Sequence, residues 1–148
     1  MIIGVPKEIK NHEYRVGLTP ESVEELVKDG HKVIIETSAG IGIGAYDTSY
    51  KKAGASIAKN ASEVFRDAEM IVKVKEPQAL ERKMLKQGQV LFTYLHLAPD
   101  RQQTIDLIES KAVCIAYETV TDIQGGLPLL KPMSQVAGRL AIQVGAAA

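Results

Sequence analysis

The sequence has very few of the residues that build covalent or metal-based frameworks. Cys114 is its only cysteine. One cysteine cannot form an internal disulfide or a thiolate metal cluster, so both are excluded and a reducing compartment, the cytoplasm, is expected. The three histidines, His12, His31 and His96, have no metal-ligand spacing with another ligand. We therefore predict no metal site.

The sequence also lacks an excess of charge and any long apolar run. Its 18 Lys plus Arg residues balance 18 Asp plus Glu residues, so no overall field attracts nucleic acid or an anionic membrane. No apolar stretch reaches the roughly 20 residues needed to cross a bilayer, and the N-terminus lacks the features of a signal peptide. We expect no nucleic-acid partner and no membrane partner, so an anion would have to be bound by a local arrangement of side chains.

What the sequence does contain is an alternation of short apolar runs and amphipathic segments. Of its 148 residues, 45% are hydrophobic, which suffices for one compact domain. The alternation predicts an α/β fold with a mainly parallel sheet flanked by helices. The predicted strands are Ile2–Val5, Lys32–Glu36, Ser56–Ala58, Met70–Lys75, Val90–Leu95 and Val113–Glu118. The predicted helices are Pro20–Asp29, Ala61–Arg66, Gln78–Leu85, Arg101–Ser110 and a long one from Lys131 onward.

Two of these strands end in polar residues suited to an anion site. Lys75 and His96 stand at the carboxyl ends of their strands, where open α/β sheets bind ligands. Arg15 lies in the loop that leaves the first strand, so we expect it at the same rim. An arginine fork donates two parallel hydrogen bonds to a carboxylate, and a lysine adds a point charge. The alternative is that these residues, with Lys73 and Arg139, are ordinary solvated surface charges.

The segment Gly40–Ala45 formally fits the dinucleotide fingerprint G-x-G-x-x-A. The fingerprint requires a helix that opens directly from the glycines, with an acidic residue at the end of the next strand. Here Tyr46–Ser49 instead has the character of a fresh helix start, so we predict a flexible glycine loop. The sequence also has no G-x-S-x-G elbow, which disfavours a serine hydrolase.

Several stretches together resemble the N-terminal region of the alanine dehydrogenases, a family shared in part with the α-subunit domain of proton-translocating transhydrogenase. They are Gly4–Glu8, Asn11–Pro20, Val72–Pro77, Tyr94–Ala98, Ala116–Val120 and Pro132–Arg139. Leu95–Ala98 and Tyr117–Val120 favour the alanine dehydrogenase branch, because the transhydrogenase lacks this histidine.

The resemblance implies a flavodoxin- or Rossmann-like substrate domain. Residues 1–130 would form an incomplete substrate-binding domain, and residues 131–148 would begin a helix that leads to an NAD-binding domain. The chain ends inside a helical pattern without a C-cap, so we expect a truncated chain. On its own it should not transfer hydride, because nothing in it holds the cofactor.

The resemblance also implies roles for individual residues. Arg15 and Lys75 would bind the substrate carboxylate and carbonyl oxygen, His96 would serve as acid and base, and Tyr94 would line the pocket. Met133 and Ser134 would contact the NAD cofactor. Histidine suits the proton transfers of deamination, and a lysine beside the carbonyl would stabilise negative charge on oxygen. The implied reaction interconverts L-alanine with pyruvate and ammonia, in a homo-oligomer that is commonly a hexamer in this family.

Two other functions remain open at this point. The chain could belong to the transhydrogenase α-subunit domain, which binds nucleotide and reduces no amino acid. It could also be a non-catalytic module that recognises a small carboxylate. Both are alternatives to the interpretation that the chain is part of an amino-acid dehydrogenase.

Overall fold

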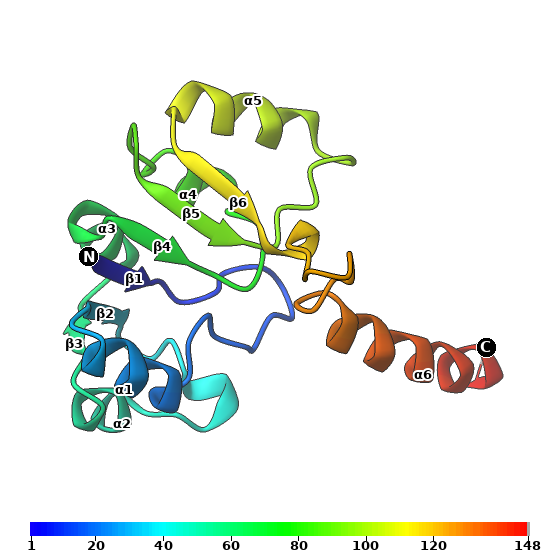
Figure 1. Ribbon diagram of the computed structural model, residues 1–148, viewed down its shortest axis with the longest axis horizontal. Coiled ribbons are helices and arrows are strands. Elements are labelled where there is room, and N and C mark those ends of the chain that lie inside the picture. Colours follow the sequence, from blue (N-terminus) through cyan, green and yellow to red (C-terminus); the bar gives the residue numbers. More distant parts are fainter. Residues whose placement is uncertain (148) are drawn as a thin grey trace. The chain divides into compact units, whose positions relative to one another are not determined.

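A computed structural model describes residues 1–147 (Figure 1). The strands are β1 (Ile2–Val5), β2 (Lys32–Glu36), β3 (Ser56–Ala58), β4 (Met70–Val72), β5 (Val90–Thr93) and β6 (Val113–Ala116). The helices are α1 (Pro20–Lys28), α2 (Asp47–Lys52), α3 (Ala61–Asp67), α4 (Ala79–Arg82), α5 (Arg101–Ser110) and α6 (Lys131–Ala147). Two 3₁₀ turns, η1 (Ile41–Ile43) and η2 (Tyr117–Thr119), complete the list.

The six strands form one parallel sheet in the order β3-β2-β1-β4-β5-β6 (Figure 1). From β1, the next two strands along the chain, β2 and β3, are added on one side. The chain then crosses to the other side of β1, where β4, β5 and β6 are added in turn. Because crossover connections are right-handed, the two directions place α1 and α3 on opposite faces of the sheet. The predicted α/β class is confirmed, and the order reverses between β1 and β4, where Ile3 lies opposite Met70.

The core lies around the central strands, which are apolar because both faces of the sheet are covered. Val5, Ile35, Ile71 and Leu91 are each fully buried in β1, β2, β4 and β5. Their burial removes most of their side-chain surface from water, at about 1.5–3 kcal/mol each. This apolar centre is why the polar residues discussed below collect at the strand ends.

The helix ends follow the capping signals in the sequence. Thr19 caps α1 by accepting a hydrogen bond from the Ser22 N–H at 3.4 Å, with proline in the first turn. Gly30 follows the helix with a φ of 84°, the left-handed conformation that glycine adopts without strain. In α5, Leu107 faces the core whereas Ile108 is exposed, so Ile108 is the apolar residue that lies outside the buried face.

Four predicted elements extend too far by two residues or more. The strand predicted over Met70–Lys75 ends at Val72, because the N–H groups of Val74 and Lys75 turn to the Glu8 carboxylate at 2.7 and 3.4 Å. The other three also end early. The strand predicted over Val90–Leu95 ends at Thr93, the strand over Val113–Glu118 gives way to η2 at Tyr117, and the helix over Gln78–Leu85 is only Ala79–Arg82.

The chain divides into two compact units, Met1–Ile115 and a second that begins at Ala116. The sheet up to Ile115 and its helices α1 to α5 make up the first unit, whereas η2 and α6 belong to the second. The helix predicted from Lys131 onward is confirmed as α6. The domain division predicted at residue 130 stays a prediction. Over residues 1–147, no helix combines the length and apolar character that a membrane span requires.

Candidate functional site

Three of the predicted site residues follow the carboxyl ends of three neighbouring strands. Arg15 lies in the connection after β1, Lys75 comes shortly after β4, and His96 shortly after β5. In the sheet order β1-β4-β5 these strand ends are adjacent. The reversal of strand order between β1 and β4 is the position at which parallel sheets of this kind leave a crevice for ligands.

The Tyr94 ring is close to both Lys75 and His96. The Lys75 Nζ atom is 5.4 Å from the centroid of the Tyr94 ring, within the range of a cation–π contact. The rings of Tyr94 and His96 are 5.7 Å apart between centroids and tilted by 33°. The structure therefore brings Lys75, Tyr94 and His96 together as one continuous cluster.

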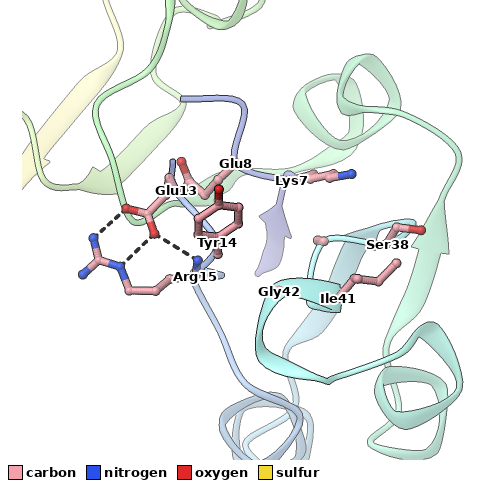
Figure 2. A pocket seen from close by; sticks show the side chains of 9 residues that line it. Lys7, Glu8, Glu13, Tyr14, Arg15, Ser38, Ile41 and Gly42 are labelled. Carbon is pink, nitrogen blue, oxygen red and sulfur yellow. Dashed lines mark hydrogen bonds and ion pairs between the residues drawn. The ribbon is translucent and has the colours of Figure 1, made fainter. Parts of the chain in front are cut away.

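The Arg15 side chain pairs with the Glu13 carboxylate, as Figure 2 shows. The Glu13 carboxylate accepts hydrogen bonds from Nε of Arg15 at 2.8 Å, from Nη2 at 2.6 Å and from the Arg15 backbone N–H at 2.9 Å. These hydrogen bonds, with a smaller contribution from the charge of Lys75, hold the pKa of Glu13 below its usual range. The Arg15 guanidinium is thus paired with Glu13, a residue that no pattern in the sequence singled out in advance.

A buried ion-pair cluster supports the segment that carries Lys75. The Lys73 side chain is fully buried, and its Nζ lies 2.7 Å from Glu81 Oε1 and 3.2 Å from Glu8 Oε2. The interpretation of Lys73 as a solvated surface charge is therefore wrong. Its backbone follows β4 into the interior, where an ammonium is retained only when carboxylates pair with it.

Glu8 links this cluster to the site, because its other oxygen accepts the N–H groups of Val74 and Lys75. Burial raises the pKa of Glu8 above its usual range, although the Lys73 charge acts in the opposite direction. Sequence reasoning missed Glu8 and Glu81. The one available signal was a charged residue, Lys73, directly after a buried apolar strand.

The glycine-rich segment packs against the loop that contains Arg15. It folds into η1, and a Cβ atom on Gly42 would overlap the backbone carbonyl of Tyr14. A pocket of about 290 Å³ lies beside this contact, and Figure 2 shows Tyr14 and Lys7 facing Ser38 and Ile41 across it. Arg15 extends away from η1 in the same view.

His96 has an uncommon backbone conformation, with a φ of 45° in the left-handed region. A non-glycine residue there costs of order 1–2 kcal/mol, so the surrounding structure must hold it in place. Histidine is one of the residue types that tolerates this region better than most. The conformation turns the chain after β5 and leaves the His96 residue exposed.

The remaining predicted site residues lie in the second compact unit. Met133 and Ser134 are in the first turn of α6, where the Ser134 N–H donates to the Leu130 carbonyl at 3.1 Å. Arg139 is exposed on the same helix. The roles assigned to Met133 and Ser134 stay predictions.

No three His, Cys, Asp or Glu side chains within residues 1–147 are grouped so that they could hold a metal ion. Cys114 is half-buried, and its burial raises the pKa of the thiol. A raised pKa leaves less of the reactive thiolate at neutral pH, which argues against a nucleophilic role for this cysteine.

Residues 4–137 match the family described as "Alanine dehydrogenase/PNT, N-terminal domain". The alanine dehydrogenase of Halomonas elongata is 57% identical over 146 residues, which are 99% of this chain and 39% of that protein. The alanine dehydrogenase of Mycobacterium tuberculosis strain H37Rv is 51% identical over the same shares of the two chains. The chain therefore spans about two fifths of the length of these relatives.

Two solved structures show the same fold. A structure of L-alanine dehydrogenase has a TM-score of 0.92 and 53% identity, and the match covers 99% of this chain and 40% of that one. A transhydrogenase from Sinorhizobium meliloti has a TM-score of 0.77 and 28% identity, with 83% of this chain and 36% of that one covered. The likeness to the alanine dehydrogenase is greater by each of these measures.

Proposed function

The chain belongs to the alanine dehydrogenase/PNT N-terminal domain family, and on this premise we propose that it forms the substrate-binding part of an NAD-dependent L-alanine dehydrogenase. The reaction would be the reversible oxidative deamination of L-alanine to pyruvate and ammonia. The observation that carries the proposal is the placement of Arg15, Lys75 and His96 after the adjacent ends of β1, β4 and β5, with the Tyr94 ring in contact with both Lys75 and His96.

The chemistry of the cluster suits a small keto or amino acid. Arg15 would bind the substrate carboxylate, since a guanidinium matches its two oxygens. Lys75 would contact the carbonyl oxygen and stabilise the negative charge that develops there when ammonia adds to the keto acid, or when the carbinolamine hydroxyl loses its proton in the reverse direction. The contact with the Tyr94 ring orients the Lys75 ammonium before a substrate arrives.

His96 would move the protons. Hydrolysis of the imine requires a proton to leave the attacking water and another to reach the departing ammonia. Histidine can both accept and donate near neutral pH, which makes one residue sufficient for the two transfers. The exposed position of His96 at the end of β5 leaves its ring accessible for this exchange.

The described residues do not fit a complete dinucleotide site. The connection after β1, residues 6–19, carries Glu8, Glu13 and Arg15 where a dinucleotide fold has its glycine-rich turn, and η1 packs against Tyr14. The chain's residues therefore account for the amino or keto acid. Met133 and Ser134 are proposed to contact NAD. Most of the cofactor would be held by the part of the full-length protein that lies outside this chain.

The experiment is an assay of the full-length protein that carries this chain, with L-alanine and NAD in one direction and pyruvate, ammonia and NADH in the other. We expect His96→Ala to lower turnover by about 10²–10⁴-fold, the usual worth of a general acid–base. Arg15→Ala should mainly raise the KM for pyruvate. Equal turnover of His96→Ala and the parent protein contradicts the acid–base role, and formation of no pyruvate from L-alanine contradicts the proposed reaction.

The proposed cellular location and oligomeric state follow from the family resemblance. We propose a cytoplasmic homo-oligomer, a hexamer in the full-length protein, with L-alanine and pyruvate as the small-molecule partners. Size-exclusion chromatography with light scattering of that protein tests the assembly, and a monomer would contradict it.

A further inference from the structure

We propose that Thr93 is a positioning residue for the reaction, because its hydroxyl fixes the backbone from which the Lys75 side chain extends. The inference rests on the proposed function, since it concerns the residue proposed to contact the substrate carbonyl oxygen. Thr93 is the last residue of β5, and its Oγ1 atom donates a hydrogen bond to the Lys75 carbonyl at 2.8 Å. Thr93 is fully buried, so its effect on a substrate must pass through a neighbouring residue.

The Thr93 hydroxyl is a buried polar group at an apolar position of the strand. Leu91 and Thr93 are the two buried residues of β5, and they lie on the same face of the sheet because side chains alternate along a strand. Valine has nearly the same shape and would fill this position without a polar atom. A buried hydroxyl costs free energy unless it is hydrogen-bonded, and here its partner is the carbonyl of a proposed site residue.

The backbone groups of Lys75 bind side chains instead of a neighbouring strand. β4 ends before Lys75, and backbone hydrogen bonding toward β5 continues as far as the Val74 carbonyl, which accepts the Tyr94 N–H at 3.4 Å. The Lys75 N–H lies 3.4 Å from the Glu8 carboxylate, and the same oxygen accepts the Val74 N–H at 2.7 Å. The Lys75 carbonyl accepts the Thr93 hydroxyl. Side chains from two other segments therefore hold this residue after regular pairing has ended.

Glu8 and Thr93 hold Lys75 from its two sides along the chain. Glu8 binds the peptide group before the Lys75 Cα atom, and Thr93 binds the peptide group after it. Fixing both peptide groups fixes the direction in which the side chain leaves the backbone. Lysine has a long flexible stem, so this fixed start and the Tyr94 ring, 5.4 Å from Nζ, together determine where the ammonium lies. Displacement of such a group from the reacting atoms lowers the rate.

The alternative is that Thr93 only stabilises the fold, in which case the activity of its variants would follow their stability. Two reciprocal substitutions separate the roles. Thr93→Val keeps the volume and removes the donor, whereas Thr93→Ser keeps the donor and removes a buried methyl group. Gln89→Met is the matched control at the other end of β5, because the buried Gln89 side chain donates to the Phe65 and Ala68 carbonyls at 2.9 and 2.8 Å.

The measured quantities are kcat/KM for pyruvate, with ammonia and NADH, and the midpoint of urea unfolding, both in the full-length protein. We expect Thr93→Val to lower kcat/KM by about tenfold, since a displaced site residue loses its optimal position. Thr93→Ser and Gln89→Met should stay within about twofold of the parent protein, although both should unfold at lower urea concentrations.

An unchanged kcat/KM in Thr93→Val, with pyruvate still reduced, overturns the inference and leaves the proposed function standing. An equal loss of kcat/KM in Thr93→Ser or in Gln89→Met also overturns it, because activity would then follow stability and not the hydrogen bond to Lys75.

Two further outcomes are decisive. If Thr93→Val fails to fold, Thr93→Cys takes its place, because a thiol is a weaker donor than a hydroxyl. A kcat/KM for Thr93→Cys equal to that of Thr93→Ser then overturns the inference. If the parent protein reduces no pyruvate at all, the proposed function fails and the inference fails with it.

Discussion

The Lys75 ammonium lies 5.4 Å from the centroid of the Tyr94 ring, and this contact connects two strand ends that carry different parts of the proposed chemistry. Lys75 follows β4, and Tyr94 immediately follows β5. The same ring lies 5.7 Å from that of His96, so a single aromatic side chain contacts both the cation and the proposed acid–base group.

Replacing the Tyr94 ring should therefore loosen the site. We expect Tyr94→Leu to raise the KM for pyruvate about three- to tenfold, because an exposed cation–π contact is worth about 0.5–1 kcal/mol and His96 loses its neighbour as well. Tyr94→Phe keeps the ring and should remain within about twofold of the parent protein on the same grounds. Steady-state kinetics of the full-length protein measure both, and equal KM values for Tyr94→Leu and Tyr94→Phe would show that the ring plays no part.

Gly42 should matter to substrate binding although it lies outside the cluster. In Gly42→Ala the added Cβ would overlap the Tyr14 carbonyl, so the loop between Glu13 and Arg15 must shift. We expect a rise in the KM for pyruvate of tenfold or more, since a shift of about 1 Å in a positioning group can cost about 10²-fold.

Gly44→Ala is the control for this substitution. Gly44 has a φ of 77° but open space around its Cβ position. The variant should lose about 1–2 kcal/mol of stability through backbone strain while keeping the parental KM. A KM that rises equally in both variants would show that general destabilisation, and not the Tyr14 contact, is responsible.

Lys73 should be essential to the stability of the first compact unit. Lys73→Met would leave Glu8 and Glu81 buried without their cation, and breaking a buried pair in this way costs about 3–5 kcal/mol. Lys10→Met breaks the partly exposed pair with Glu76 and should cost about 1 kcal/mol or less. Urea unfolding at neutral pH compares the two, and similar losses would contradict the account of the buried cluster.

Glu8 should make the free energy of unfolding of this unit depend on pH in a distinctive way. Burial raises its pKa in the folded state above 4.5, so between 4.5 and the raised value the folded chain binds more protons than the unfolded chain. The contribution of Glu8 to the free energy of unfolding is therefore greatest below 4.5 and falls as the pH rises through the raised pKa. Glu8→Gln removes this decline.

The measurement is the difference in the free energy of unfolding between Glu8→Gln and the parent chain, taken by urea unfolding at several pH values from 4.5 to 7. As the pH rises, the free energy of unfolding of Glu8→Gln should increase relative to that of the parent chain. A difference that moves in favour of the parent chain would mean that the folded-state pKa of Glu8 is lowered.

The sequence predicted the fold class and most element starts, because these depend on local patterns. The apolar run Ile2–Val5 and the cap at Thr19 needed no knowledge of distant residues. Where the strands end was less predictable. β4 stops at Val72 because Glu8, from another part of the chain, captures the N–H groups that follow, and no local pattern in Met70–Lys75 contains that information.

The same distinction applies to the site. Arg15, Lys75 and His96 were predictable as strand-end residues and from the family resemblance. The partners that hold them were not, because a charged residue in a sequence does not reveal its counter-ion. Lys73 and Glu8 are 65 positions apart, and only the parallel pairing of β1 with β4 brings them together. Glu13 lies just two residues from Arg15, but its role depends on how the loop folds back.

Binding of pyruvate to the 148-residue chain, followed through the ring resonances of His96 and Tyr94, tests the convergence of the three residues most directly. The account predicts saturable shifts of both rings at millimolar pyruvate, with loss of the shifts in Arg15→Ala and in Lys75→Ala while both variants remain folded. Shifts that persist unchanged in both variants, or that appear only at residues away from the ends of β1, β4 and β5, would contradict it.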